Sequence, residues 1–431
     1  MVQHAHNQQI GKESGTRSTS TPPEALVRPL TLWILGSVSA ATLAFYVALL
    51  SRQRQIDFDV YRMGGQHVLG SGLYSSHLTV LGRDLVFTYP PLAALLFWPL
   101  SHLSTFAGQI VWDAIDLIAL TALIAVSIAA ARDRRLVRSD WRTALIVLFP
   151  FCFLLFPVRE NLELGQINIV LVLMIVADLA IGVSWRGKRL PQGVLVGLAA
   201  AVKLTPLVFL PYLVATRQWR SARNMALSFS LATGAMFAVS PHASWLYFTR
   251  DAFDVKRVGS ISQVINQTLH AAIVRAHLSP SHALVDLVNA VVLCGGIVLA
   301  VIAYRHSSAM LGILLCAATG LLVSPISWLH HYVWVVPTLV WLVAGVDRPA
   351  KGVQWALAAA ALFMVIPPSP PADSNVLWYL RENSYVLLTL VFIGLIGMML
   401  WVRSRMTVID ATPSGSRQDT ERIPDTVSLI P

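Results

Sequence analysis

The sequence contains few charged residues and very few cysteines. Asp, Glu, Lys and Arg make up 13% of its 431 residues, about half of the roughly 25% that is typical of soluble domains. Hydrophobic residues account for 55%, so an ordinary soluble globular protein is excluded. The three cysteines, Cys152, Cys294 and Cys316, lie inside apolar runs and lack metal-site or paired spacing. They are interpreted as small buried apolar residues.

Two further absences narrow the functional classes. The sequence has no visible internal repeat, and its net charge of +10 comes from basic residues that are scattered over short loops. A nucleic-acid-binding protein gathers its Lys and Arg on one face or along one helix. We therefore expect no nucleic-acid partner.

The sequence is instead rich in long apolar runs. The first, Leu30–Leu50, has 21 residues and no charge, which at about 1.5 Å per residue is enough to cross a bilayer. It is too long for the core of a cleavable signal. Residues 1–29 and 404–431 are polar and are predicted to be disordered cytoplasmic tails. Residues 30–403 are predicted to form an all-α polytopic transmembrane bundle of about 10–12 helices, with outer-face loops and short interfacial helices.

The connections between apolar runs separate into two kinds by their charge. Short connections rich in Lys and Arg remain on the cytoplasmic side of a membrane. Five connections hold 14 Lys or Arg and are assigned to that side: residues 132–142, 184–190, 217–223, 305–308 and 347–351. Three others hold only Arg159 and Arg381 and are assigned to the outer side: residues 157–164, 325–330 and 368–384. The longer connections 51–103 and 241–284 then also lie outside.

One apolar run does not fit simple alternation. Gly193–Ala215 is about one span long, yet basic connections flank it on both sides, and Lys203 and Pro206 interrupt it. Either the run is a bent hairpin that returns to the same face, or the charge of one flank gives the wrong side of the membrane. Proline favours the bend because it removes a helix hydrogen bond. With the hairpin, the chain makes ten full crossings plus two short helices. Both termini are then cytoplasmic, and Asp57 shares the outer face with His330 and His331.

Ionisable side chains stand directly after the first apolar run, in Asp57–Tyr61 (DFDVY), followed by Arg62. Ionisable groups at the mouth of a membrane span are expensive to keep there and suggest a functional site. The alternative is an ordinary solvated loop. The candidates here are Asp57, Asp59, Tyr61 and Arg62.

A short apolar run follows within the same outer connection. Tyr89–Pro99 (YPPLAALLFWP) has about ten apolar residues between prolines, which is too few to span a bilayer. We expect a helix that lies in the interface, with Tyr89, Pro90 and Trp98 in contact with a lipid chain. The alternative is that Tyr89 and the prolines begin the next transmembrane helix.

Three polar residues occur inside apolar runs, where each needs a partner or a ligand. Gln166 and Asn168 enter one run, and Lys203 lies deep within another. The amides could instead join neighbouring helices. The lysine could bind a phosphate, or it could pair with Asp116 or Asp178.

Two outer connections carry further candidates. Asn266 and Gln267 offer amides that suit sugar recognition, although a solvated loop has the same composition. Trp328, His330 and His331 stand at a predicted span boundary, where Trp is common in interfacial belts. Imidazole can hold a phosphate or a hydroxyl near neutral pH. A metal site is less favoured, because no third ligand accompanies the histidine pair at suitable spacing.

Six segments, in this order, resemble one known family, the actinobacterial polyprenyl-phosphate-mannose-dependent α-(1→2)-mannosyltransferases, which are membrane enzymes of the GT-C class. The segments are Asp57–Tyr61, Tyr89–Pro91, Gly165–Asn168, Lys203–Pro206, Asn266–Leu269 and Ser324–His331. The resemblance covers about residues 30–403. It implies a multi-pass protein of the plasma membrane whose active site faces the periplasm. It also implies a polyprenyl-phosphate-mannose donor and a mannosylated lipid acceptor: a phosphatidylinositol mannoside, lipomannan or lipoarabinomannan.

The resemblance further implies inversion, from a β-linked donor to an α-linked product. Asp57 is expected to act as the base that removes the acceptor proton. His330, His331 and Lys203, with Arg62 behind them, are expected to stabilise the leaving phosphate, because negative charge on it grows in the transition state. The remaining candidates are expected to bind donor phosphate or sugar. A phosphate leaves readily, so neither a cofactor nor a metal is expected.

Two other functions remain open from the sequence. Within the same chemistry, the donor could carry another lipid-linked sugar, such as arabinose or glucose. In a different class, a lipid-linked-sugar flippase or transporter would use the same polar groups to line a path. Transporters place their sites at matched midplane breaks in two repeats. Here the polar groups concentrate at one face, which favours an enzyme.

Overall fold

The structure is a computed structural model. It describes residues 54–80, 82–131, 148–185, 187–278, 281–344, 349–369 and 375–411, together with residues 36–38, 41 and 44. Almost all of the first apolar run, the whole basic connection 132–142, the N-terminal tail and residues 412–431 lie outside these ranges. The predicted total of ten crossings therefore stays a prediction.

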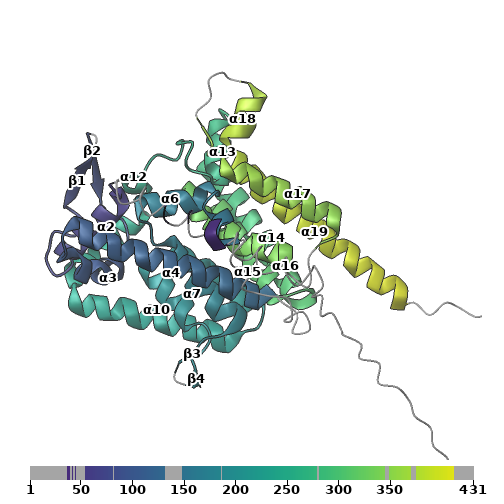
Figure 1. Ribbon diagram of the computed structural model, residues 1–431, viewed down its shortest axis with the longest axis horizontal. Coiled ribbons are helices and arrows are strands. Elements are labelled where there is room, and N and C mark those ends of the chain that lie inside the picture. The colour runs from purple at the N-terminus through teal and green to yellow at the C-terminus, as the bar shows by residue number, and fades with distance from the viewer. Residues whose placement is uncertain are drawn as a thin grey trace, which may run out of the picture.

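Three of the described helices are long and apolar enough to cross a membrane: α4 (Thr105–Ala131), α14 (His282–His306) and α19 (Ser384–Ala411, of which residues 384–405 form the apolar part). They lie in a helical bundle that fills most of the molecule (Figure 1). The prediction of an all-α membrane protein is confirmed. The predicted boundary at residue 403 is wrong, because α19 continues through Ala411 into the segment that we predicted to be a disordered tail.

Shorter helices complete the bundle. They are α7 (Asn168–Val176) with the π-helical turn η1 (Ala177–Ile181), α8 (Val194–Val202), the 3-10 helix η2 (Thr205–Val208), α9 (Phe209–Ala215), α10 (Trp219–Val239), α15 (Ala309–Val323), the 3-10 helix η4 (Leu329–Trp334), α16 (Val335–Ala344), α17 (Lys351–Leu362) and the 3-10 helix η5 (Phe363–Val365). Large apolar side chains, among them Trp341, Tyr212 and Phe209, are fully buried between them.

Further short elements connect these helices. They are α2 (Ile56–His67), α3 (Pro91–Ser101), α6 (Phe156–Leu164), α11 (Pro241–Thr249), the 3-10 helix η3 (Asp251–Phe253), α12 (Val255–Val258), α13 (Leu269–Arg275) and α18 (Val376–Glu382). Two small antiparallel hairpins accompany them: β1 (His77–Val80) with β2 (Arg83–Val86), and β3 (Ser184–Trp185) with β4 (Lys188–Arg189). His77 pairs with Val86 in the first, and Ser184 with Arg189 in the second.

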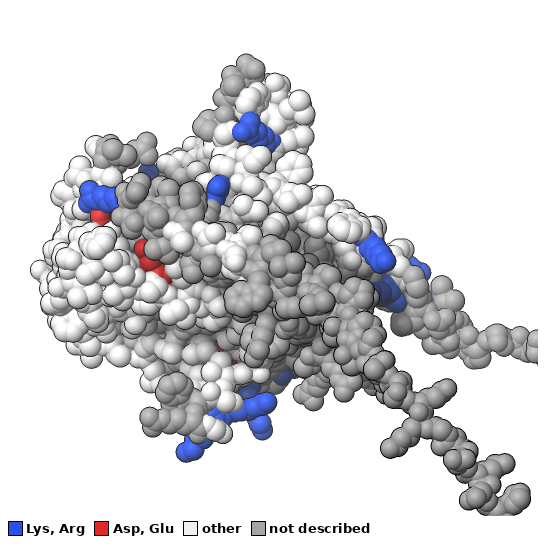
Figure 2. Space-filling model, in the orientation of Figure 1, with Lys and Arg blue, Asp and Glu red and all other residues white. Residues whose placement is uncertain are grey.

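The two kinds of connection lie at opposite ends of the bundle. Strands β1 and β2 and helices α6, α12, α13 and α18, all from connections predicted to be outside, gather at one end (Figure 1). The β3–β4 hairpin, from a basic connection, lies at the other end. Lys and Arg side chains gather around that hairpin, while most of the visible described surface is uncharged (Figure 2). The outer connections named here and the basic β3–β4 hairpin thus lie at opposite ends of the bundle; which side of a membrane each faces stays a prediction.

Gly193–Ala215 is a bent hairpin in the structure. Helix α8 ends at Lys203, whose backbone is extended (φ −149°, ψ 127°), and the chain resumes as η2 at Thr205. The two ends of the run lie together, since Ser221 Oγ donates to Gln192 Oε1 at 3.2 Å and Asn224 Nδ2 donates to the Gln192 carbonyl at 2.9 Å. Of the two alternatives that the sequence left open, the structure has the hairpin, with Lys203 at its tip.

The short apolar run is a separate helix, as expected. Helix α3 begins at Pro91, has 11 residues and ends before α4 begins at Thr105. It packs closely on α2, because a Cβ on Gly65 would lie 2.8 Å from the Phe97 carbonyl oxygen. The alternative, in which Tyr89–Pro91 begins the next long helix, is not what the structure shows.

Candidate active site

A cavity of about 730 Å³ lies at the end of the bundle that carries β1, β2, α6 and α12. Segments far apart in the sequence line it: α2, the Thr88–Pro90 strand end, the α6–α7 bend, the tip of the α8–α9 hairpin and η4. Its polar lining on this side is Asp57, Tyr61, Tyr89, Glu160, Gln166, Lys203, His330 and His331. The structure thus brings Asp57 and the two histidines into one cavity.

Helix α2 presents Asp57 to this cavity. Residues 57, 60 and 61 all line it, as residues three and four apart on a helix share a face. Asp57 stands in the first turn, and Asp57 Oδ2 accepts a 2.6 Å hydrogen bond from Gln166 Nε2. This acid is therefore held by a residue more than a hundred positions away along the chain.

Gln166 is fixed by a network of donors around its side-chain oxygen. Gln166 Oε1 accepts from Tyr61 Oη at 2.8 Å, from Tyr89 Oη at 3.1 Å and from Asn168 Nδ2 at 3.2 Å. Because these donors occupy the oxygen, the amide nitrogen points toward Asp57. Gln166 and Asn168 sit at a 120° bend between α6 and α7, where Gly165 adopts a left-handed conformation (φ 72°). The bend itself builds this part of the site.

Burial governs the acidity of Asp57. Desolvation raises the pKa of its carboxyl above the ordinary 3.8, and the positive charges of His330 and Lys203, with the Gln166 hydrogen bond, offset part of that rise. A carboxylate with a raised pKa is a stronger base than one in water. The environment therefore suits proton removal.

Lys203 reaches this cavity from the tip of the hairpin. Lys203 Nζ donates to Asn168 Oδ1 at 2.7 Å and lies 2.9 Å from His331 Nε2 and 3.5 Å from Tyr89 Oη. The ion pairs that the sequence offered as an alternative do not form. Asp178 instead accepts the backbone N–H groups of Gly193 and Val196, and Asp116 lies beside Asn161.

The two histidines differ in their surroundings. His331 is fully engaged, since its Nδ1 accepts the Trp328 backbone N–H at 3.2 Å and its Nε2 faces Lys203. His330 is buried (4% exposed), and neither ring nitrogen has a hydrogen-bond partner within the described residues. Its Nδ1 lies 3.3 Å from Glu160 Oε2, within ion-pair distance. Of the two imidazoles, His330 is thus the one without a hydrogen bond among the described residues.

Two candidates from α2 do not face the cavity. Arg62 Nη2 donates to the Leu103 carbonyl at 2.6 Å and Arg62 Nη1 to Thr105 Oγ1 at 2.7 Å, so this side chain holds the α3–α4 turn. Asp59 forms a 2.6 Å ion pair with Arg54. Neither residue lines the cavity, because positions 59 and 62 point away from position 57 on a helix with 3.6 residues per turn.

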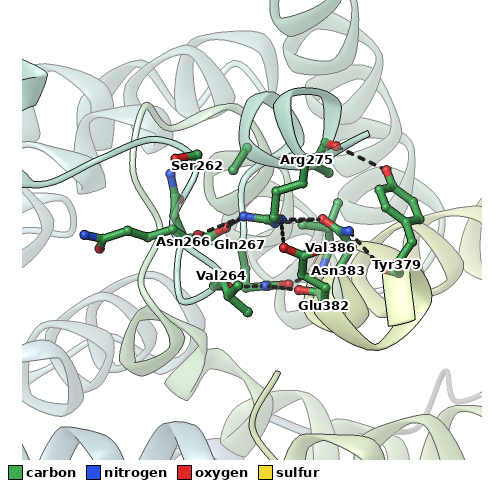
Figure 3. Close-up of polar contacts among 12 residues, drawn as sticks. Ser262, Val264, Asn266, Gln267, Arg275, Tyr379, Glu382, Asn383 and Val386 are labelled. Atoms are coloured by element: carbon green, nitrogen blue, oxygen red, sulfur yellow. Dashed lines mark hydrogen bonds and ion pairs between the residues drawn. The ribbon is translucent and has the colours of Figure 1, made fainter. Parts of the chain in front are cut away.

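Asn266 and Gln267 are also structural in this fold. Gln267 is fully buried; Gln267 Nε2 donates to the carbonyls of Val264 and Glu382, and Gln267 Oε1 accepts from two backbone N–H groups of α19. Asn266 Oδ1 accepts the Ser327 N–H at 3.0 Å. Figure 3 shows them beside Arg275, which donates to Asn383 and to the Asn266 carbonyl. The amides expected to contact sugar instead join segments of the protein, and neither residue lines the cavity.

The three residues predicted to contact a lipid chain do not all lie in the cavity. Tyr89 and Pro90 line the cavity, whereas Trp98 does not; Trp98 stacks edge-on against His102 on the outside of α3 and is 40% exposed. Trp328 lines the cavity, as expected. A smaller apolar pocket of about 60 Å³ adjoins Lys203 and His331, between Leu171, Phe209 and Trp334.

The sequence reasoning missed several residues of the cavity. Glu160 follows Arg159 in the second outer connection, but nothing in its sequence context marks it as a candidate. Tyr247, Asp251 and Arg257 also line the cavity. They come from connection 241–284, and nothing in their spacing indicated that they would share a cavity with Asp57. In the part of the chain that the structure describes, no three His, Cys, Asp or Glu side chains are grouped to hold a metal ion.

The helices and this cavity define an all-α membrane protein of the GT-C type, in which broken helices bring polar groups to one end of the bundle. The model of glycosyltransferase family 87 matches residues 87–325, more than half of the chain. The chain belongs to glycosyltransferase family 87.

Curated relatives match over most of their length. The chain is 32% identical to a polyprenol-phosphate-mannose-dependent alpha-(1-2)-phosphatidylinositol mannoside mannosyltransferase of Mycobacterium tuberculosis, over 87% of this chain and 91% of the relative. A protein of the same description from Mycolicibacterium smegmatis is 34% identical, over 80% and 84%. A pentamannoside mannosyltransferase of that species is 31% identical, over 82% and 87%. No solved structure matches the chain. The family resemblance expected from the sequence is confirmed.

Proposed function

We propose that this protein transfers mannose from polyprenyl-phosphate-mannose to a mannosylated lipid and forms an α-(1→2) linkage. The observation that carries the proposal is the single cavity that holds Asp57 together with Lys203 and His330. The names of relatives at 31–34% identity support the donor and the class of acceptor. Because a phosphatidylinositol mannoside enzyme and a pentamannoside enzyme match almost equally well, identity does not choose between acceptors.

The reaction is a single displacement. The acceptor hydroxyl oxygen forms a bond to the mannose anomeric carbon, and the bond from that carbon to the phosphate oxygen breaks. The electron pair of the broken bond leaves with polyprenyl phosphate, and the hydroxyl proton passes to Asp57. Attack opposite the leaving group inverts the β-linked donor to an α-linked product. A positioned base contributes roughly 10²–10⁴-fold to such a step.

Lys203 and His330 are proposed to hold the leaving phosphate. Lys203 Nζ is fixed by Asn168 and lies beside His331, while His330 has both ring nitrogens free of hydrogen bonds within the described residues. Fixed donors aimed at developing charge lower the barrier without reorganisation. The apolar pocket next to Lys203 would take the first part of the polyprenyl chain. We propose that the transfer requires neither a metal nor another cofactor.

The cavity is proposed to open on the periplasmic side of the plasma membrane, with both termini in the cytoplasm. The support is the basic character of the β3–β4 end, opposite the cavity, since Lys and Arg in short loops favour the cytoplasmic side. This orientation also suits a lipid-linked donor, which delivers sugar where nucleotide sugars are absent.

The test is transfer by purified protein. Incubation with polyprenyl-phosphate-mannose and a panel of mannosylated phosphatidylinositols should yield a product whose new linkage is α-(1→2). Asp57→Asn should lower the rate by about 10²–10⁴-fold while donor binding is retained. Products with another linkage, or full activity of the Asp57→Asn variant, would contradict the proposal. A transporter would have no transfer activity to lose.

The absence of a metal requirement has its own measurement. Activity should persist after treatment with EDTA. Loss of transfer in EDTA that Mg²⁺ or Mn²⁺ restores would show that a metal takes part.

A further inference from the structure

One wall of the cavity, formed by β2, η3 and the residues around α12, carries a second group of charged side chains that the proposed reaction leaves unused. Asp84, Asp251, Asp254 and Arg257 all line the cavity there. Arg250, which does not line the cavity, pairs with Asp251 at 2.8 Å. Hydrogen-bonding capacity, and not net charge, is therefore what this wall offers a ligand.

Asp251 and Arg257 each have an unused hydrogen-bonding atom at the centre of this wall. Asp251 is 8% exposed; its Oδ1 accepts from Arg250 Nε at 2.8 Å, but its Oδ2 is buried with no partner in the described part of the chain. Arg257 Nε likewise has none there, although Arg257 Nη2 donates to the Tyr74 carbonyl at 2.9 Å. Buried polar atoms without partners are costly, and they call for a ligand or water.

One hydroxyl group can bridge these two side chains. Arg257 Nε lies 3.9 Å from Asp251 Oδ1, too far for a direct hydrogen bond. A hydroxyl oxygen that lies beside both atoms can accept from Arg257 Nε and donate its hydrogen to the carboxylate. A single sugar hydroxyl does both at once.

A row of aromatic rings joins this wall to the proposed reaction centre. Tyr61 contacts Tyr89 (5.2 Å between ring centroids), Tyr89 contacts Phe87 (6.0 Å), Phe87 contacts Tyr74 (6.1 Å) and Tyr74 stacks on Tyr247 (5.7 Å). Tyr61, Tyr89 and Tyr247 line the cavity themselves. Cavities that bind ligands combine such aromatic walls with a few placed polar groups. A chain of sugars could lie along this row, with one end at Asp57.

We propose that Asp251 and Arg257 form a subsite that binds a hydroxyl of an acceptor sugar remote from the reacting one. The inference rests on the proposed function, because it concerns the acceptor of that same transfer. In this arrangement the phosphate of the donor lies at Lys203 and His330, and the sugars of the acceptor extend toward Asp251 and Arg257. The subsite selects acceptors by length, since a shorter acceptor leaves Asp251 Oδ2 and Arg257 Nε without a hydrogen-bond partner.

The test is a comparison of acceptor lengths in Asp251→Asn. The probes are octyl mannosides with one to four sugars, assayed with polyprenyl-phosphate-mannose and the full-length protein in detergent. For the acceptors long enough to reach the subsite, Asp251→Asn should raise the KM about tenfold, as expected for the loss of a hydrogen bond to a charged group. The KM for the donor, kcat and the KM for the shortest acceptor used should each change less than about twofold.

Asp286→Asn is the matched control. Asp286 is an exposed carboxylate of α14 that does not line the cavity, so this variant should behave as the unmodified protein with every acceptor. If Asp251→Asn lowers Tm by more than about 5 °C, Arg257→Lys replaces it. Arg257→Lys keeps the charge and loses the Nε donor, so the same dependence on acceptor length is expected.

Three outcomes would overturn the inference. An unchanged KM for long acceptors would mean that water alone fills the gap. A KM that rises equally for all acceptors would indicate a general change of the cavity and not a remote subsite. If the unmodified protein transferred mannose to none of the octyl mannosides and none of the mannosylated phosphatidylinositols, the proposed function would be refuted instead, and with it the basis of the subsite.

Discussion

At the scale of single residues, Gln166 decides how the acid of this site is presented. Its side-chain oxygen accepts from two tyrosines and Asn168, so its nitrogen is directed to Asp57 Oδ2. Asp57 Oδ1 has no hydrogen-bond partner among the described residues and stays available for a substrate proton. Asn168 also accepts from Lys203. One amide pair therefore connects the proposed base to the cation proposed to bind phosphate, and it fixes their relative positions.

The raised pKa of Asp57 predicts a pH dependence of transfer. The carboxylate must be deprotonated to accept a proton, so kcat/KM should fall as the pH drops through the pKa of Asp57 in the folded protein, which lies above 3.8. The pH–rate profile measures this limb. An acid limb at or below pH 3.8, while Tm stays constant over the same range, would contradict the assignment.

The same shift predicts that Asp57 lowers the stability of the folded protein. Its pKa is raised on folding, so the stability that it contributes in the protonated form is lost as the pH rises through 3.8 to the folded-state value. Asp57→Asn should therefore raise Tm at pH 7.5, and the gain should disappear below pH 3.8. Thermal unfolding of both proteins across this range measures it, and an Asp57→Asn variant less stable at pH 7.5 would contradict it.

At the scale of elements, the site depends on helices that stop. The α6–α7 bend places Gln166 and Asn168 at the cavity, and the α8–α9 hairpin places Lys203 there. Non-helical backbone at membrane depth is tolerated where it lines a polar cavity, and both breaks do so. Each break also changes the partners of backbone groups that a continuous helix would have bonded. The Gln166 N–H, for example, donates to the Asn161 carbonyl, five residues earlier, at 2.8 Å.

Substitution of Gly165 should disrupt the first of these breaks. A Cβ there would lie 2.7 Å from Phe58 Cβ, and the left-handed backbone (φ 72°) disfavours any other residue. Gly165→Ala should cost about 1–3 kcal/mol and lower transfer, because the turn that holds Gln166 must shift. Thermal unfolding and transfer rates measure both effects.

Gly234→Ala serves as the control for that substitution. Gly234 lies within α10 and a Cβ there meets nothing within 4 Å, so the change should be neutral or stabilising by up to about 1 kcal/mol. Equal effects of the two substitutions would argue against a special role for the bend.

At the scale of the whole molecule, the bundle has two unlike ends. One end carries β1, β2, α6 and α12, whose residues help to line the cavity, and the other carries the basic β3–β4 hairpin (Figures 1 and 2). A donor and an acceptor that are both lipids can enter such a cavity from the membrane while their head groups meet at one face. The lipid tails then supply binding energy remote from the reacting atoms.

Thiol accessibility tests the orientation of these two ends. In a protein without its native cysteines, Lys256→Cys near the cavity should react with a membrane-impermeant thiol reagent in intact cells. Lys188→Cys in the β3–β4 hairpin should react only after the membrane is permeabilised. Both side chains are exposed. The reverse labelling pattern would place the cavity in the cytoplasm and contradict the proposed topology.

The sequence by itself determined the class of protein and its two faces. Apolar runs of fixed minimum length and Lys or Arg in short loops act through the bilayer, which responds to composition and not to detailed packing. Polar groups near apolar runs are costly in a bilayer, so the sequence alone also predicted functional candidates. They are Asp57, Gln166, Asn168, Lys203 and the histidine pair. The sequence also predicted the short helix α3 from its prolines, and the hairpin from a proline and a lysine within an apolar run.

Only the tertiary structure decided which polar residues meet. Asp59 and Arg62 lie within five positions of Asp57 but turn to other faces of α2, and the amides of Asn266 and Gln267 bind backbone groups. Conversely, Asp251 and Arg257 reach the cavity from a connection whose spacing carries no such signal. Helix phase and long-range packing set these contacts, and both depend on how the bundle closes.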